Sequence, residues 1–264
     1  MTAASASAEP YLRSEPMGSA HLVTLARPVN RNALTDDFCT AIADELLRIA
    51  RAGEARAILL TGDGGHFSVG GDLGWLVSLR GSADAPRIAA GIAAFQTLIR
   101  TVVALPIPVI ALVQGSAAGF GLDLALACDY RIAGESLQAT SAFARMGLVP
   151  DGGSSYSLRT LMPAGAAFKF LTTGEVASAT HALHLGLVDQ VVPDAGLLDA
   201  GLAFVGAIAA QPASSVSAIK ALVRRTDIAA LEDALAAEAK AQVEAASGPD
   251  FGARAHAFLN RKKG

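Results

Sequence analysis

The stretch that decides the fold is VIALVQGSAAGFGLDLALACD, residues 109–129. Its first five residues are apolar and have the length of a buried strand. A turn containing Gly115, Gly119 and Gly121 follows, and the apolar run 122–127 continues as a helix. The free backbone N–H groups at the start of such a helix can stabilise a negatively charged oxygen. The stretch therefore predicts a strand–turn–helix unit in an α/β core, with a candidate anion site at the turn.

Three functions are open to this turn. The spacing Gly115-x-x-x-Gly119-x-Gly121 is typical of short-chain dehydrogenases, but those enzymes carry it after their first strand and need a Tyr-x-x-x-Lys. None of the three tyrosines of this chain has a lysine four residues later. The small residues could instead serve only close packing of strand and helix. The third function is an oxyanion site.

A second glycine turn favours the oxyanion site. The segment FSVGGDL (67–73) follows another apolar strand candidate, residues 57–61, and also presents backbone amides. Two such loops can direct two N–H donors at one carbonyl oxygen. That arrangement stabilises a thioester enolate or a tetrahedral oxyanion.

The composition excludes several classes of protein. Hydrophobic residues make up 52% of the 264 residues and charged residues 17%, which excludes a charge-solvated disordered chain. The net charge of −3 creates no positive field for nucleic acid. Cys39 and Cys128 form no CxxC pair or zinc motif, so we expect free thiols in a reducing cytoplasm. The most apolar stretch, residues 101–113, is too short to span a membrane, and the N-terminus lacks the pattern of a signal peptide.

The pattern of elements predicts three segments. Residues 1–15 indicate a flexible tail, and residues 16–196 an α/β core in which strand and helix signals alternate around glycine loops. Strands are expected at 21–26, 57–61, 108–113 and 129–133, and helices at 35–52, 86–105 and 122–127. From residue 197 to 264 only alanine-rich amphipathic helices are expected, at 200–210, 214–225 and 231–246. Such a helical region often serves as an oligomer contact or a lid.

The order of motifs along the chain resembles the enoyl-CoA hydratase/isomerase (crotonase) superfamily. The resemblance covers about residues 21–263 and rests on five motifs in order: RPVNRNAL (27–34), FSVGGDL (67–73), GSAAGFGLDLALACD (115–129), GLVPDGG (147–153) and ALHLGLVDQVVP (182–193). It implies a spiral of ββα units with a helical C-terminal region, assembled as a homotrimer or hexamer. It also implies an acyl-CoA thioester substrate, with coenzyme A as part of the substrate and no separate cofactor.

The resemblance also assigns binding residues. The thioester carbonyl would lie between the N–H groups of Gly71 and Phe120, where the family usually has glycine at the second position. The Phe120 side chain would then need a pocket of its own and could reshape the acyl site. Contacts to the coenzyme A ester are implied for Arg27, Ala33, Leu34, Ser68, Val69, Gly70, Asp72, Leu73, Phe143 and Lys262.

The acidic residues decide which reaction is expected. Hydratases of this family use two carboxylates; Asp123 matches the first position, but Phe143 stands at the second and cannot activate water. Asp151 in GLVPDGG matches the single acid of the family's enoyl-CoA isomerases and ring-opened phenylacetyl-CoA epoxide isomerases. One base in an apolar pocket could move a proton from C2 to C4 while the amides hold the dienolate. We therefore expect double-bond isomerisation with Asp151 as the proton shuttle.

Alternatives remain open at this point. The enzyme could be an enoyl-CoA hydratase of fatty-acid β-oxidation that uses Asp123 and Asp151 as a pair, or the chain could bind acyl-CoA without catalysis. Asp151 could be only a turn residue after Pro150, and Asp123 only a carboxylate placed at a helix start. Asp129 is interpreted as a structural tie between strand and helix. No metal site, serine nucleophile elbow, nucleic-acid partner or membrane partner is expected.

Overall fold

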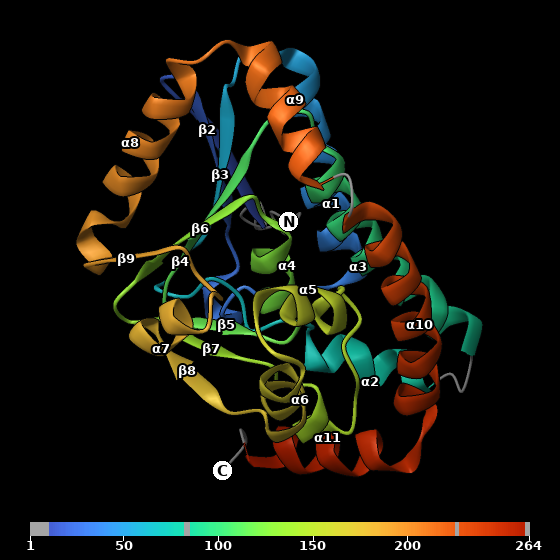
Figure 1. The fold of residues 1–264 in the computed structure, drawn as a ribbon. Helices are drawn as coiled ribbons and strands as arrows, with labels where there is room; N and C mark the ends of the chain where they lie inside the picture. The colour runs from blue at the N-terminus through green and yellow to red at the C-terminus, as the bar shows by residue number, and fades with distance from the viewer. Residues whose placement is uncertain (1–10, 82–84, 225–226, 262–264) are drawn as a thin grey trace, which may run out of the picture.

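The structure is a computed structural model, and it describes residues 11–81, 85–224 and 227–261. A six-stranded sheet runs through the molecule in the order β1-β2-β3-β4-β6-β9 (Figure 1). β1 pairs antiparallel with β2, and every later pair in this sheet is parallel. The strands are β1 (Leu12–Met17), β2 (Ala20–Leu25), β3 (Ala57–Gly62), β4 (Val109–Val113), β6 (Tyr130–Gly134) and β9 (Gln190–Val192).

A smaller three-stranded sheet lies beside the large one, in the order β5-β7-β8. It contains β5 (Ser116–Ala118), β7 (Gln138–Thr140) and β8 (Val176–Ser178). β5 follows β4 almost directly, so the turn quoted first above connects the two sheets. Ser68 and Leu34 add isolated parallel bridges, Ser68 to Ala117 and Leu34 to Gly71, which bring the two glycine loops to this junction.

The central strands are buried on both faces because helices cover both. In β3, Ile58 and Leu60 belong to the larger hydrophobic core, whereas Ala57 and Leu59 belong to a second core on the opposite face. This alternation follows from the two-residue period of a strand. α1 (Asp36–Ala52) and α3 (Ala85–Ala104) cover the first face, and α8 (Leu197–Ala209) covers the second (Figure 1).

α1 begins as the sequence predicts. The Thr35 hydroxyl accepts a hydrogen bond from the Phe38 N–H at 3.3 Å, and Asp36 and Asp37 lie in the first turn, where the helix dipole favours negative charge. Gly53, at φ +71°, ends the helix. α1 packs on α3, the one helix of the described residues that is long and apolar enough to cross a membrane; half of its apolar window is buried in the core, as in a core helix.

The remaining helices of the first part of the chain surround the glycine loops. They are α2 (Leu73–Gly81), α4 (Phe120–Ala127), α5 (Ser154–Leu161), α6 (Ala164–Thr173) and α7 (Ala179–His184), with short 3-10 turns at Pro28–Asn30, Ala144–Met146 and Asp194–Gly196. The expected helix at 122–127 thus begins two residues earlier. As a result, Phe120 is the first residue of α4.

After β9, the described residues form only helices. A 3-10 turn, α8, α9 (Ala213–Arg224), α10 (Asp227–Ser247) and α11 (Pro249–Arg261) follow one another. α9 and α10 lie on the side of the molecule opposite α8, and α11 crosses the end near α2 and α6 (Figure 1). α10 contacts both α3 and α5, which carries the C-terminal region to the glycine loops.

Asp129 joins this helical region to the core, in line with its interpretation as a structural residue. Its carboxylate lies 2.7 Å from Lys220 Nζ and 3.4 Å from Arg224 Nε, both on α9. The same carboxylate accepts the N–H of Val109 at 2.8 Å, at the start of β4. The Lys220 ammonium also donates to the carbonyl of Ile107 at 3.0 Å. These contacts fix α9 to one end of the central sheet.

The sequence prediction needs three corrections. The proposed tail at 1–15 is too long, because residues 12–15 belong to β1; only Leu12 and Met17 of that strand are partly buried, so its pattern resembles a polar segment. Residues 1–10 lie outside the described residues. The helices α2 and α11 are also absent from the prediction. α2 starts directly at the end of a glycine loop, and α11 follows a Ser-Gly-Pro break.

Candidate functional site

The first glycine loop directs one backbone amide away from the sheet. Leu34 uses both of its backbone groups on the residues that flank Gly71: its N–H donates to the Gly70 carbonyl at 2.8 Å, and its carbonyl accepts from Asp72 N–H at 2.7 Å. The backbone groups of Gly71 then point away from Leu34. Within the described part of the chain, no hydrogen bond occupies the Gly71 N–H. Gly70, at φ +85°, makes the turn that this arrangement requires.

The second glycine loop presents the first N–H of α4. Gly119 has φ +51° and ψ −129°, a conformation restricted to glycine, and its own N–H donates to the Thr140 carbonyl at 3.0 Å. Phe120 follows as the first helical residue, so no turn of helix precedes it to accept its N–H. A Cβ placed on Gly70 would lie 3.1 Å from Phe120 N and 2.6 Å from the Ala118 carbonyl. The two loops are therefore in direct contact.

A narrow apolar pocket opens in front of these loops, with a volume of about 80 Å³. Phe120 contributes both its backbone and its ring, which meets the ring of Phe95 edge-on with centroids 4.4 Å apart. Phe95 in turn stacks on Trp75 at 5.2 Å. The buried Phe120 side chain thus becomes part of the wall. The pocket is lined by Val69, Gly71, Leu73, Leu76, Phe95, Gly119, Phe120, Ala142, Phe143, Met146, Leu148, Asp151 and Gln242.

Asp151 carries the only carboxylate among the described residues that line this pocket. Its side chain is almost buried, with 7% exposed. Oδ2 accepts a hydrogen bond from Gln242 Nε2 at 3.1 Å, whereas Oδ1 has no partner in the described structure. Burial raises the pKa of Asp151 to about 7, and the negative charge of Glu238 acts in the same direction; the hydrogen bond from Gln242 opposes them. This carboxyl can therefore accept and return a proton near neutral pH.

Asp123 occupies a different place. It lies on α4 with 2% of its surface exposed, and its Oδ2 accepts the Gly152 N–H at 3.1 Å. It is not among the described residues that line the pocket. Burial, and then the charges of Glu238 and Asp151, raise its pKa well above the ordinary value. Through this hydrogen bond, Asp123 supports the loop that carries Asp151 without lining the pocket.

Two residues of α10 complete the site and were not predicted from the sequence. The Glu238 carboxylate accepts the Gly153 N–H at 2.7 Å and the Ser155 N–H at 2.9 Å, so it caps α5 from outside that helix. Gln242 accepts the Val149 N–H at 3.0 Å. Both lie in an alanine-rich helix whose sequence shows no motif, and both are buried only because α10 packs on the loop at 149–155.

The predicted coenzyme A contacts gather around the first loop. The Arg27 guanidinium donates to the Ala33 carbonyl at 2.8 Å, lies 3.5 Å from Asp72 and covers the Tyr11 ring at 4.9 Å. Leu34 and Gly70 join this group through the backbone bond described above. Val69, Leu73 and Phe143 line the apolar pocket.

Ser68 and Lys262 differ from the others. The Ser68 side chain is fully buried; its hydroxyl donates to the Asn32 carbonyl at 2.8 Å and accepts the Gly70 N–H at 3.1 Å. Its role in the structure is to shape the glycine loop. Lys262 lies outside the described residues, so its predicted contact has no structural counterpart.

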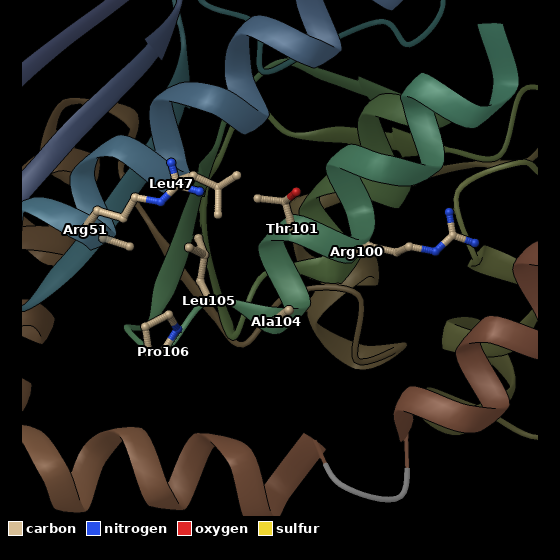
Figure 2. Close-up of a pocket in the computed structure, with 8 residues that line it drawn as sticks. Leu47, Arg51, Arg100, Thr101, Ala104, Leu105 and Pro106 are labelled. Carbon is tan, nitrogen blue, oxygen red and sulfur yellow. The ribbon is translucent and has the colours of Figure 1, made fainter. Parts of the chain in front are cut away.

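A second pocket, of about 380 Å³, lies between α1 and α3 (Figure 2). The described lining contains no carboxylate, and Arg100 is directed toward α10, where it pairs with Glu232 at 2.8 Å. This pocket lacks an acid, a nucleophile and free amides, so it is not the candidate site. It is lined by Leu47, Ala50, Arg51, Arg100, Thr101, Ala104, Leu105 and Pro106.

Metal chemistry has no matching donor set in the residues that the structure describes: no group of three or more His, Cys, Asp or Glu side chains is placed to hold an ion. His66, beside the first loop, accepts the Ser116 N–H through Nδ1 at 3.1 Å. Cys39 and Cys128 are buried free thiols. The polar groups of the described pocket lining are thus the Asp151 carboxyl group, the Gln242 side-chain amide and the backbone amides of the glycine loops.

Comparisons with known proteins identify the family and the fold. The family model described as enoyl-CoA hydratase/isomerase matches residues 16–264. A probable enoyl-CoA hydratase of Rhodobacter capsulatus is 34% identical over 242 residues, 91% of each chain. The 1,2-epoxyphenylacetyl-CoA isomerase of Escherichia coli is 32% identical over 241 residues, 91% of this chain and 92% of its own. The crystal structure of an enoyl-CoA hydratase from Mycobacterium avium subsp. paratuberculosis superimposes with a TM-score of 0.85 at 30% identity, covering 96% of both chains.

Proposed function

Because the chain belongs to the enoyl-CoA hydratase/isomerase family, we propose that it is a double-bond isomerase of enoyl-CoA thioesters with Asp151 as the proton shuttle. The observation that carries this proposal is the single carboxylate in the pocket. Asp151 lines the pocket, whereas Asp123 accepts the Gly152 N–H outside the pocket lining and Phe143 fills the position of a second acid.

The proposed reaction starts with the thioester oxygen of a 3-enoyl-CoA between the N–H groups of Gly71 and Phe120. The Asp151 carboxylate removes a proton from C2, and the electron pair moves into the thioester to form a dienolate. The two amides stabilise the negative oxygen of this intermediate. The neutral Asp151 carboxyl then returns the same proton to C4, and the double bond moves from C3=C4 to C2=C3. Atoms and charge balance without a cofactor.

The pKa of Asp151 suits both steps. At about 7, the carboxyl is close to half deprotonated at neutral pH, so it serves as base for the first transfer and as acid for the second. An exposed aspartate would be a weaker base, because its pKa would be lower by about three units. The apolar wall, with Phe95, Phe120 and Phe143, supplies the burial that raises the pKa.

The same wall disfavours hydration. Addition of water to a 2-enoyl-CoA needs a group that holds and activates the water while a proton reaches C2. Asp123 could serve only if its carboxylate left the Gly152 amide and entered the pocket. Because some relatives are named as hydratases, hydration is the competing outcome in the test.

The test compares two substrates with one protein. Purified enzyme is incubated with trans-3-enoyl-CoA and, separately, with trans-2-enoyl-CoA, and 2-enoyl and 3-hydroxyacyl products are measured. We expect conversion of the 3-enoyl ester and loss of that activity by at least about 10³-fold in Asp151→Asn, with ester binding retained. Efficient formation of the 3-hydroxyacyl ester would overturn the proposal. Binding without turnover of either ester would indicate an acyl-CoA-binding homologue.

We also propose that the protein assembles as a trimer or a dimer of trimers. An apolar recess of about 400 Å³ lies between α5, α8 and α9, and its rim includes the exposed side chains of Ile219 and Val223. Leu222, also exposed, lies beside them on α9. Light scattering of the full chain measures the mass of the assembly, and a monomer would contradict this proposal.

A further inference from the structure

We propose that Gln242 is a positioning residue that holds the Asp151 carboxyl group in the orientation in which it exchanges the proton. This inference rests on the proposed function, since it concerns the base of that reaction. It assigns to α10, a helix of the C-terminal region, a direct part in the chemistry of the pocket. The observation behind it is the pair of hydrogen bonds that the Gln242 amide makes to the loop at 149–151.

The orientation of the Gln242 amide is determined by its first contact. Oε1 accepts the Val149 N–H at 3.0 Å, and only the oxygen of the amide can accept there. Nε2 must then face Asp151, where it donates to Oδ2 at 3.1 Å. A rotated amide would place an oxygen against a carboxylate and an NH₂ group against an N–H. With 2% of its surface exposed, Gln242 has no room for other orientations.

The consequence concerns the two oxygens of Asp151. Oδ2 is occupied by an N–H donor, so a proton on Oδ2 would compete with that hydrogen bond. Oδ1 has no hydrogen-bond partner in the described structure, but its surface is also covered. The orientation in which the carboxyl group meets the pocket is therefore the one that the Gln242 hydrogen bond fixes. Gln242 holds the carboxyl plane in place between the two transfers, as catalysis by a single base requires.

The charges around Asp151 make this neutral donor important. Glu238 faces it from α10, Asp123 from α4, and the Cys39 thiol from α1. Of these, Glu238 raises the pKa of Asp151 through its negative charge. The hydrogen bond from Gln242, and after it the backbone N–H of Asp151 itself, lower this pKa against the effect of burial, and the balance leaves it at about 7. Without this donor, the pKa would rise further.

The test uses two glutamines that differ in one respect. Gln96 is also buried and also joins α10, since its Nε2 donates to the Leu235 carbonyl at 2.7 Å, but it does not line the pocket. Gln242→Met and Gln96→Met both remove a buried amide of the same size. The pKa of Asp151 is measured in each free protein by ¹³C NMR of labelled aspartate, with Asp151→Asn to assign the signal. Gln242→Glu, which keeps an oxygen toward Val149, is the second variant.

We expect Gln242→Met to raise the pKa of Asp151 by about one unit, whereas Gln96→Met leaves it unchanged. The alkaline shift should appear in the pH profile of kcat/KM, with a roughly five-fold loss at pH 7 from protonation and a further loss that high pH does not restore. KM should change little. Gln242→Glu should shift the pKa in the same direction.

An unchanged pKa of Asp151 in Gln242→Met and Gln242→Glu, or an equal shift in Gln96→Met, would overturn the inference. The NMR titration needs no substrate. If the wild-type protein failed to isomerise 3-enoyl-CoA, the proposed function would fall, and the titration would still decide whether Gln242 controls the Asp151 carboxyl.

Discussion

Asp151→Asn is expected to make the folded protein more stable at neutral pH, although it removes the proposed catalytic base. The wild-type carboxyl is buried beside the negative charge of Glu238, and the hydrogen bonds from Gln242 and from its own backbone N–H only partly offset this unfavourable environment. Asparagine has nearly the same shape and still accepts the hydrogen bond from Gln242, but it carries no charge. The substitution thus removes a charged group whose burial is unfavourable.

The size of the effect follows from the pKa. Asp151 titrates at 3.8 in an ordinary environment and at about 7 in the folded protein. The folded state therefore binds the proton more tightly than the unfolded state, so wild-type stability falls as the pH rises from about 4 to about 7. The pKa difference of about three units between the unfolded and folded states corresponds to about 4 kcal/mol in the free energy of unfolding. Below pH 4, both states are protonated and the loss disappears.

Urea unfolding at fixed protein concentration measures this effect at several pH values. We expect the free energy of unfolding of Asp151→Asn to exceed that of the wild type by up to about 4 kcal/mol at pH 8 and by nearly nothing at pH 4. Asp129→Asn is the matched control, since it weakens the ion pair with Lys220 and should destabilise the protein at pH 8. If Asp151→Asn lowered the free energy of unfolding equally at both pH values, burial would not destabilise the charged Asp151 carboxylate, and the argument from its raised pKa would be refuted.

Three further substitutions test separate parts of the site. Gly119→Ala should lower kcat by about 10²-fold, because backbone strain at φ +51° displaces the first N–H of α4. The added Cβ itself causes no clash, since the nearest atom lies 3.8 Å away. Steady-state kinetics of the folded variant measures this effect, and a normal kcat would exclude the Phe120 amide from the reaction. Glu238→Gln should lower the pKa of Asp151, since a negative neighbour is removed, and an alkaline shift of the kcat/KM profile would contradict this. Lys220→Met should cost about 3 kcal/mol in urea unfolding, because the Asp129 carboxylate keeps only the longer of its two ion pairs, the one to Arg224, beside the Val109 N–H. A cost under about 1 kcal/mol would show that α9 is held by other contacts.

The local features of the fold could be read from the sequence. The apolar runs at 57–61 and 109–113 predict β3 and β4, because a strand buried on both faces must be apolar at successive positions. Thr35 and Gly53 mark the two ends of α1 through short-range capping. The glycine turns predict two loops with available amides, and the family resemblance assigns the donors to Gly71 and Phe120, each preceded by a glycine of positive φ.

Other parts of the fold gave no local signal. β1 is exposed along most of its length and is held by backbone bonds to β2, so its sequence resembles a tail. α2 begins where a glycine loop ends, and its apolar residues do not form one clear stripe. β1 depends on its backbone bonds to the adjacent strand, and α2 depends on contacts with α3 and α11.

The amino-acid sequence by itself determined which groups are available to the chemistry: two glycine turns with bare amides, Asp123 and Asp151, and a phenylalanine where a second acid would be needed. Only the tertiary structure shows that Asp151 lines the pocket and Asp123 does not, because the direction of each side chain depends on the loop at 149–155 and on the helix packed against it. The same packing brought Glu238 and Gln242 to the base from about 90 residues away. Burial by distant segments sets both the pKa of Asp151 and its free oxygen, and no local pattern encodes such burial.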